Sequence, residues 1–224
     1  MRYEIKEAPF GILICQLEQG ESMKCQHGGM AWMDRGIEMA TKTGGLGKMF
    51  KKAFTGENIF YNTYTAYQPG EIAFAMSFPG RIMSIDVSRA PIIAQKRSFL
   101  ACEPTVDVDI FFRKKLSAGI FGGEGFILQQ FSGRGMTFLE VDGGLIEKEL
   151  APGQEVIIDS GHLAAMEASC TLNVETVKGL GNIVAGGEGL FNTVITGPGK
   201  VWLQTMPIVN LAGALQPYIV TTSS

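Results

Sequence analysis

Few residues in the sequence combine the type and the spacing that catalysis requires. Cys25 and His27 stand two residues apart, so a strand would place both side chains on one face, where a histidine can activate a thiol. No orienting third group accompanies this pair. The second histidine is His162, and a metal ion at either histidine needs further ligands, for which Glu167 or Cys25 are the candidates. We predict no catalytic residue and no metal-binding residue.

Two glycine-containing segments invite a phosphate-binding interpretation, which their details argue against. Around residues 43–48, the spacing of a phosphate loop requires a glycine where this chain has Lys42 and a serine or threonine where it has Met49. The other segment, residues 123–125, contains an acidic Glu124 that would repel a phosphate. A turn explains that segment better, and we predict no cofactor.

One segment is predicted to contact something outside the chain. Between residues 46 and 54, apolar residues recur with helical spacing and lysines lie on the other side. A cap over the β core is the structural interpretation, and contact with a partner protein or an anionic membrane is the functional one. The contact residues predicted in this segment are Leu46, Lys48, Met49, Phe50, Lys51, Lys52 and Phe54.

Composition limits the class of protein. Hydrophobic residues make up 46% and charged residues 18%, while 29 glycines among 224 residues indicate many tight turns between strands. The net charge of -3 argues against a nucleic-acid-binding role. Four cysteines without a C-x-x-C pair, and an N-terminus unlike a signal peptide, predict free thiols in a reducing cytoplasm.

An internal repeat organises the chain. Residues 122–139 align without a gap with residues 186–203, 64 positions later, and a third copy begins near Gly56. The preceding halves repeat as well, since residues 17–31 match residues 150–164 at a spacing of 133. We therefore predict three repeats of about 65 residues. Their expected bounds are 1–81, which includes the segment 46–54, then 82–144, and 145–224, which includes a C-terminal tail.

The elements of each repeat are predicted to be strands. Residues 155–159 and 136–141 are short runs of β-forming residues, and residues 132–135 and 196–199 have the glycine spacing of hairpin turns. The sequence therefore predicts an all-β fold, a sandwich or a rolled barrel. Four aromatic residues are expected to fill its core: Trp32, Phe60, Phe138 and Trp202.

These glycine signatures resemble a known family. The Gly-Glu-Gly runs, the Phe-Ser-Gly-x-Gly hairpin at 131–135 and the Phe-Gly-Gly-Glu-Gly at 121–125 are similar to bacterial members of the "altered inheritance of mitochondria" biogenesis family, over essentially the whole chain. The resemblance implies double-stranded β-helix repeats like those of the tryptophan RNA-binding attenuation protein, packed here with pseudo-threefold symmetry. RNA binding does not follow, because the basic triplet 113–115 is not repeated at 177–179.

The functional hypothesis is a non-enzymatic β-scaffold that forms a homo-oligomer and contacts a partner protein or a membrane surface. A small-ligand binding module is the first alternative, since β-barrels often hold ligands. An enzyme of unknown chemistry is the second, and it would draw on Ser160, His162 and Glu167 in the third repeat.

Overall fold

Short strands make up most of the computed structural model, which describes residues 1–6, 10–41, 61–114, 125–176 and 191–219. Many of these strands alternate between buried and more exposed residues, as a strand covered on one face does. In β3 (Ser22–Gln26), Met23 and Cys25 are fully buried between half-buried Ser22, Lys24 and Gln26. The prediction of an all-β fold is confirmed.

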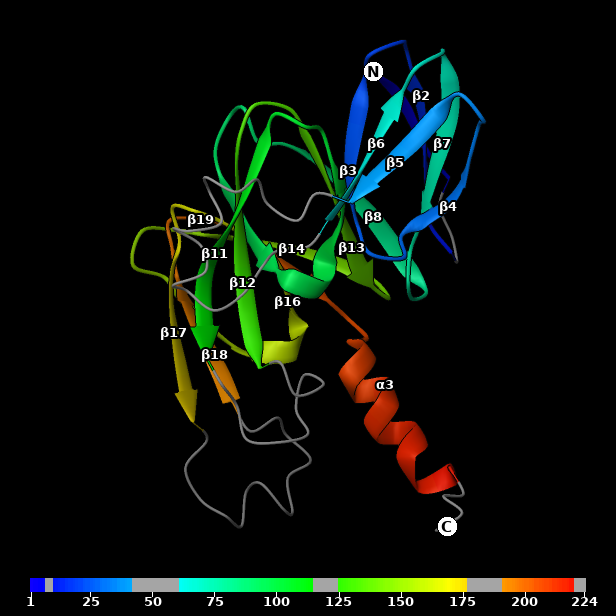
Figure 1. Ribbon diagram of the computed structural model, residues 1–224. Coiled ribbons are helices and arrows are strands. Elements are labelled where there is room, and N and C mark those ends of the chain that lie inside the picture. The colour runs from blue at the N-terminus through cyan, green and yellow to red at the C-terminus, as the bar shows by residue number, and fades with distance from the viewer. Residues whose placement is uncertain (7–9, 42–60, 115–124, 177–190, 220–224) are drawn as a thin grey trace. The chain divides into compact units, whose positions relative to one another are not determined.

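The described residues form two compact units, which together contain nineteen strands (Figure 1). Unit 1 comprises residues 1–91, 97–109 and 130–140, and unit 2 comprises residues 92–96, 110–129 and 141–224. The strands that lie in unit 1, in whole or nearly so, are β1 (Arg2–Lys6), β2 (Ile12–Leu17), β3, β4 (Met30–Met33), β5 (Ile37–Thr41), β6 (Tyr61–Ala66), β7 (Gly70–Ala75), β8 (Gly80–Asp86), β10 (Phe99–Cys102) and β13 (Met136–Asp142).

Unit 2 contains the remaining strands and the C-terminal helix. The elements that lie wholly in it are β9 (Ile92–Gln95), β14 (Leu145–Leu150), β15 (Glu155–Asp159), the 3-10 turn η4 (Ser160–His162), β16 (Leu163–Glu167), β17 (Thr171–Thr176), β18 (Phe191–Thr196), β19 (Gly199–Gln204), α3 (Ile208–Leu215) and the 3-10 turn η5 (Gln216–Tyr218). Besides β13, whose last two residues lie in unit 2, the elements with residues in both units are η2 (Lys96–Ser98), β11 (Val106–Lys114) and β12 (Phe126–Gly133). The predicted second repeat, residues 82–144, is thus divided between the two units.

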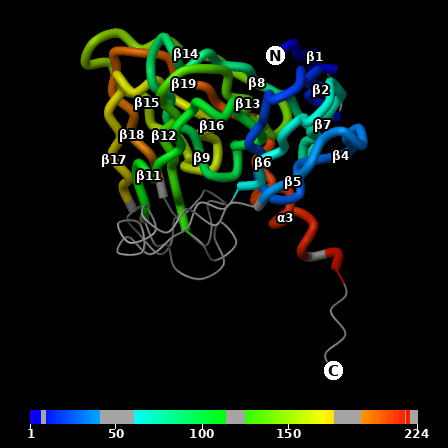
Figure 2. The backbone as a smooth tube through the Cα atoms, turned by 45° about the horizontal axis from the view of Figure 1, so that its top comes forward, coloured from blue at the N-terminus to red at the C-terminus, as the bar shows by residue number. Residues whose placement is uncertain are grey.

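Four antiparallel sheets arrange these strands. The strand orders are β1-β2-β7-β4 and β5-β6-β3-β10-β13-β8, then β11-β12-β9-β16-β19-β14 and β15-β18-β17. The last sheet has β18 between its two neighbours, and β17 runs beside it in both views (Figure 1 and Figure 2). In unit 1, β2 and β4 both pair with β7, while β3 and β5 both pair with β6.

The predicted strands and hairpins are present at their expected places. Residues 155–159 form β15, and residues 136–141 lie in β13. Glycines close the two predicted hairpins with positive φ angles, 122° at Gly135 and 142° at Gly199. A side chain at Gly135 would also collide with Glu103, because an added Cβ would lie only 2.5 Å from its Oε2. Glycine is therefore required at this turn.

Each unit has an apolar core of its own, and the predicted core aromatics differ in their burial. Phe138 is fully buried in unit 1, where the ring of Tyr3 packs edge-on at a centroid distance of 4.9 Å. Trp202 is half-buried on β19. The prediction that Trp32 fills the core is wrong: its side chain is 44% exposed on β4, which ends its sheet. Phe60 lies outside the described residues.

Candidate functional site

The environment of Cys25 opposes nucleophilic chemistry with His27. Cys25 is fully buried, and its thiol donates a hydrogen bond to the carbonyl oxygen of Gln26 at 3.2 Å. Burial raises the pKa of the Cys25 thiol, and the nearby Glu140 carboxylate raises it further. Because the thiolate is the reactive form of cysteine, this thiol is held in its unreactive form at neutral pH.

The other three cysteines share this environment. All four are free thiols and buried. Burial raises the pKa of Cys15 and that of Cys102 to about 12, and it raises the pKa of Cys170 as well. The cysteines therefore act as small apolar side chains of the two cores.

Ser160 and His162 hold the turn η4 in place. The Ser160 hydroxyl lies 2.8 Å from the hydroxyl of Thr193, and both residues are fully buried. His162 Nδ1 lies 2.8 Å from the carbonyl oxygen of Gln204, to which it can donate a hydrogen bond. The Gln204 side chain in turn donates to the carbonyl oxygen of Gly161 at 2.8 Å. This network satisfies buried polar groups around a tight turn.

Glu167, the third residue considered for an enzymatic role, has a different partner. Its carboxylate accepts a hydrogen bond from the backbone N–H of Lys200 at 2.9 Å, which ties the end of β16 to β19. Across the ranges that the structure describes, no group of three or more His, Cys, Asp or Glu residues is arranged to hold a metal ion. Ser160, His162 and Glu167 are thus each engaged in a structural contact.

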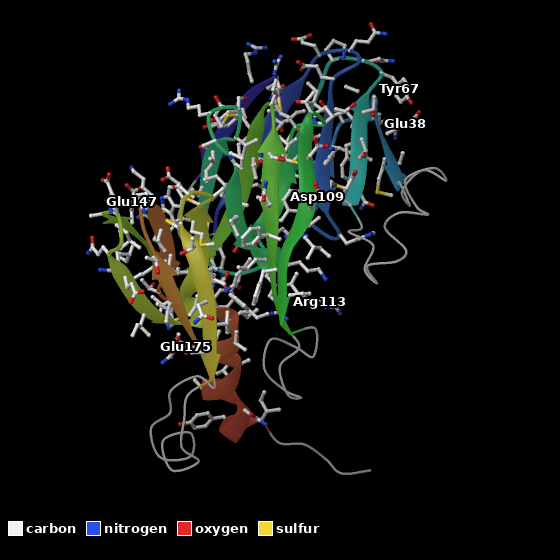
Figure 3. All side chains as sticks on the ribbon, turned by 90° about the vertical axis from the view of Figure 1, so that its left-hand side faces the viewer. Glu38, Tyr67, Asp109, Arg113, Glu147 and Glu175 are labelled. Carbon is white, nitrogen blue, oxygen red and sulfur yellow. The ribbon has the colours of Figure 1, made fainter. Side chains whose placement is uncertain are left out.

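The ends of the four sheets differ in how they are protected. Among the described strands, eight lie at sheet ends, and charged side chains on such strands discourage pairing with a further strand. Six of the eight carry an exposed charge in the interior of the strand, away from its two end residues. Examples are Glu4 in β1, Glu38 in β5, Arg81 in β8, Asp109 and Arg113 in β11, Glu147 in β14 and Glu175 in β17. Figure 3 labels five of these side chains: Glu38, Asp109, Arg113, Glu147 and Glu175. The two exceptions are β4 and β15.

Strand β4 presents an uncharged edge. Its sequence is Met-Ala-Trp-Met, its free side faces away from β7, and Trp32 is 44% exposed. The Trp32 indole N–H donates a hydrogen bond to Glu71 Oε1 at 2.9 Å, and a carboxylate oxygen of Asp34 accepts the Glu71 backbone N–H at 2.8 Å. These contacts fix the tryptophan in position while leaving its ring accessible.

Strand β15 presents a second apolar edge, in unit 2. Ile158 is buried and Val156 packs against the core, whereas Ile157 on the opposite face is 65% exposed. The charges of this strand are confined to its two end residues, Glu155 and Asp159. An apolar edge strand of this kind is a template for pairing with another strand.

The C-terminal helix α3 is a third exposed apolar element. The carboxylate of Asp142 accepts a hydrogen bond from the backbone N–H of Ile208 at 3.0 Å, and so places a negative charge at the helix N-terminus. Val209 packs against the unit 2 core. No residue of α3 is buried, and residues 206–219 carry no charged side chain. No helix in the described part of the chain is long and apolar enough to cross a membrane.

Sequence reasoning identified none of these three exposed surfaces, although it did predict the strand at residues 155–159. The predicted contact segment 46–54 lies outside the described residues, as does the segment 43–48. Helix α3 had a signal in the spacing of Ile208, Leu211 and Leu215 after Pro207. The strand edges had none, because a sequence does not state which strands end a sheet.

Comparison with known proteins gives one family and a shared fold. The family model described as mitochondrial biogenesis AIM24 matches residues 3–206. An uncharacterized protein of Streptococcus pyogenes serotype M6 is 25% identical over 233 residues, an alignment that covers 100% of this chain and 93% of that protein. A crystal structure of a Streptococcus pyogenes protein superposes with a TM-score of 0.82 at 24% identity, covering 97% of this chain and 99% of that one.

The buried cysteines lead to a prediction about thiol reactivity. At about pH 8, where an ordinary cysteine with a pKa near 8.5 is partly ionised, we expect none of the four native thiols to react with a chromogenic disulfide reagent. All four should react after denaturation. An exposed thiol introduced as Tyr218→Cys is the positive control, since Tyr218 is 83% exposed. Rapid reaction of any native thiol in the folded chain would contradict the buried environment.

The hydroxyl pair of Ser160 and Thr193 leads to a prediction about stability. Ser160→Ala removes one partner of a buried hydrogen bond and should lower the free energy of unfolding by about 1–3 kcal/mol. The double variant Ser160→Ala, Thr193→Val should cost less than the sum of the two single variants, because it leaves no hydroxyl of the pair without its partner. Urea denaturation of all four chains measures the cycle, and strictly additive losses would refute the coupling.

Proposed function

The chain belongs to the mitochondrial biogenesis AIM24 family, and we propose that it is a non-enzymatic β-scaffold that self-associates. The observation that carries this proposal is the pair of apolar sheet edges on β4, which has no charged residue, and β15, whose charges are confined to its two end residues. Exposed edges of this kind lead to uncontrolled aggregation unless something covers them. A defined assembly with further copies of the chain would cover them.

The proposal includes three repeats of six strands each, packed with pseudo-threefold symmetry as double-stranded β-helices like those of the attenuation protein. Strand pairing supports the repeats. In β2–β7 the first and third strands pair with the sixth, and the second and fourth pair with the fifth. Strands β14–β19 pair by the same rule, and β8–β13 follow it in their sheet neighbours.

A recurring hydrogen bond also supports the repeats. Glu140 accepts the backbone N–H of Ser77 at 2.7 Å in unit 1. In unit 2 the side-chain oxygen of Gln204 accepts the backbone N–H of Asp142 at 3.1 Å. Gln204 follows Glu140 by 64 residues and Asp142 follows Ser77 by 65, the spacings of the repeat. Equivalent side chains thus hold equivalent turns.

The contacts of the side chains that could take part in catalysis support a non-enzymatic role. The buried thiols are held protonated, and Ser160, His162 and Glu167 each serve a turn or a strand contact. The four free cysteines suit a reducing compartment, so the proposal locates the scaffold in the cytoplasm.

Self-association is tested by the mass of the full chain in solution. Native mass spectrometry and sedimentation velocity over a range of concentrations should show species at whole multiples of 24.2 kDa that grow with concentration. A species that stays at 24.2 kDa at every concentration would reject the scaffold proposal. A reproducible added mass would instead favour a ligand-binding module.

Contact with a partner protein or a membrane surface is the second part of the proposal. Helix α3 supports it, because its exposed apolar residues have no charged neighbours between positions 206 and 219. A helix without basic residues gains nothing from anionic lipids, so α3 suits a protein partner. The basic segment 46–54, outside the described residues, suits an anionic membrane by its composition.

Vesicle cosedimentation tests the membrane part. The full chain should bind vesicles of phosphatidylcholine with phosphatidylserine, and not vesicles of phosphatidylcholine alone. Lys51→Gln with Lys52→Gln should weaken binding by about tenfold or more, since each basic residue near an anionic surface contributes about 1 kcal/mol. Lys6→Gln with Lys148→Gln is a control of equal charge. Absence of binding to anionic vesicles would remove membrane contact from the proposal.

A further inference from the structure

Helix α3 is attached to unit 2 through its first turn (Figure 1). The Asp142 carboxylate accepts the Ile208 backbone N–H at 3.0 Å, and Val209 packs against the unit 2 core. The side-chain nitrogen of Asn210 lies 3.3 Å from Nε2 of His162, to which it can donate a hydrogen bond. Each of these contacts involves one of the first three residues of the helix.

The helix is too short to be stable through its own hydrogen bonds. It has eight residues, one of which is Gly213, and isolated helices shorter than about 12–15 residues are marginal in water. No residue of α3 is buried, and Leu215 at its end is 48% exposed. Since most helices in proteins are stabilised by packing of an apolar face, α3 needs a surface that covers its exposed side.

One face of α3 forms an apolar stripe made of Ile208, Leu211 and Leu215. These residues are three and four positions apart, so they lie on the same side of the helix. Leu211 lies two positions, or about 200°, from Val209, because each residue turns a helix by about 100°. Val209 contacts the unit 2 core, and Leu211 therefore points away from that core.

The chemistry of the stripe suits a second copy of the chain. Residues 206–219 carry no charged side chain, so the segment offers no charge for a different protein to recognise. For the same reason, two copies of the segment do not repel each other. The stripe also complements itself in an antiparallel arrangement, because Leu211 lies at its middle and the ends, Ile208 and Leu215, are both aliphatic.

We infer that α3 packs against α3 of a second copy of the chain, as an antiparallel pair related by a two-fold axis. Ile208 of each helix then meets Leu215 of the other. The two Leu211 side chains lie beside the axis next to Ala212, whose small side chain lets the helices approach closely. The contact is isologous and closes after two copies. This inference rests on the proposed self-association and names one surface that mediates it.

The size of the contact determines its strength. A helix of eight residues is about 12 Å long, so the pair buries less surface than the roughly 1,200–2,000 Å² of a typical stable interface. We therefore expect a weak dimer that dissociates on dilution. Because the contact contains no charge, its dissociation constant should change little with salt concentration.

Charge exchange at Leu211 tests the geometry. Leu211→Glu and Leu211→Lys each place like charges beside the two-fold axis, and each should weaken the dimer by about tenfold or more. An equal mixture of the two variants should form a mixed dimer that is tighter than the dimer of either variant alone, because opposite charges then meet. Sedimentation equilibrium gives the dissociation constants, and native mass spectrometry with one variant isotope-labelled identifies the mixed dimer.

Matched controls separate the stripe from general surface effects. Ile146→Glu and Ile146→Lys change an aliphatic residue of unit 2 that is 49% exposed on β14, and both variants should dimerise as the unchanged chain does. Leu211→Ala removes most of the apolar side chain while it favours the helix. It should still weaken the dimer, whereas a defect of the helix alone would be relieved by alanine.

The outcomes distinguish this inference from the proposed function. Leu211 variants that assemble as the unchanged chain does would overturn the helix contact and leave self-association standing. A mixture no tighter than either variant alone would overturn the two-fold arrangement. Binding of the unchanged chain to phosphatidylcholine vesicles that Leu211→Glu abolishes would overturn the inference in favour of lipid. An unchanged chain that is monomeric at every concentration would reject both proposals.

Disulfide formation tests the antiparallel direction if the charged variants fail to fold. Leu211→Cys chains should form an intermolecular disulfide under mild oxidation, because the two side chains lie beside the axis. Leu215→Cys chains should not, since the two Leu215 positions of an antiparallel pair lie about 10 Å apart along the helices. The native thiols are buried and do not compete. Linkage at position 215 instead, or at neither position, would refute the pairing.

Discussion

Backbone hydrogen bonding along strand edges is the constraint on which this structure depends. A strand has polar groups on two sides, and each side needs a partner strand, water or some other protection. Central strands such as β9 and β10 have a neighbour on both sides and are buried in full. Most end strands instead carry exposed charges. Among the described strands, β4 and β15 end their sheets without a charge in the strand interior, which sets them apart from the other six end strands.

Polar groups in the interior serve the turns rather than chemistry. Gln204 accepts the backbone N–H of Asp142, and Glu140 accepts that of Ser77. His162 and Ser160 fix the turn η4. Short strands joined by many turns leave buried backbone groups that strand pairing alone does not satisfy. Several side chains with catalytic potential are thereby occupied in holding the fold.

The sequence predicted the local elements well and the surfaces poorly. Glycine spacing located the hairpins at Gly135 and Gly199, and apolar runs located β13 and β15, because these signals act over a few residues. Burial of Trp32 was predicted wrongly, since it depends on whether a distant strand lies beside β4. Helix α3 was missed although Ile208, Leu211 and Leu215 follow Pro207 with helical spacing. Family membership was predicted from the glycine signatures and confirmed, while the contact segment 46–54 stays a prediction.

The position of the two tryptophans has a spectroscopic consequence. Trp32 on the β4 edge and the half-buried Trp202, whose indole N–H donates to Glu147 at 2.9 Å, are the protein's two indole fluorophores. Indole emission moves to shorter wavelength when water leaves the ring. In a chain with Trp202→Phe, Trp32 would be the one indole that emits. The wavelength of its emission maximum would report whether the β4 edge is exposed to water or covered. The intrinsic fluorescence of Trp32 can therefore monitor the β4 edge in dilute solution without an added dye.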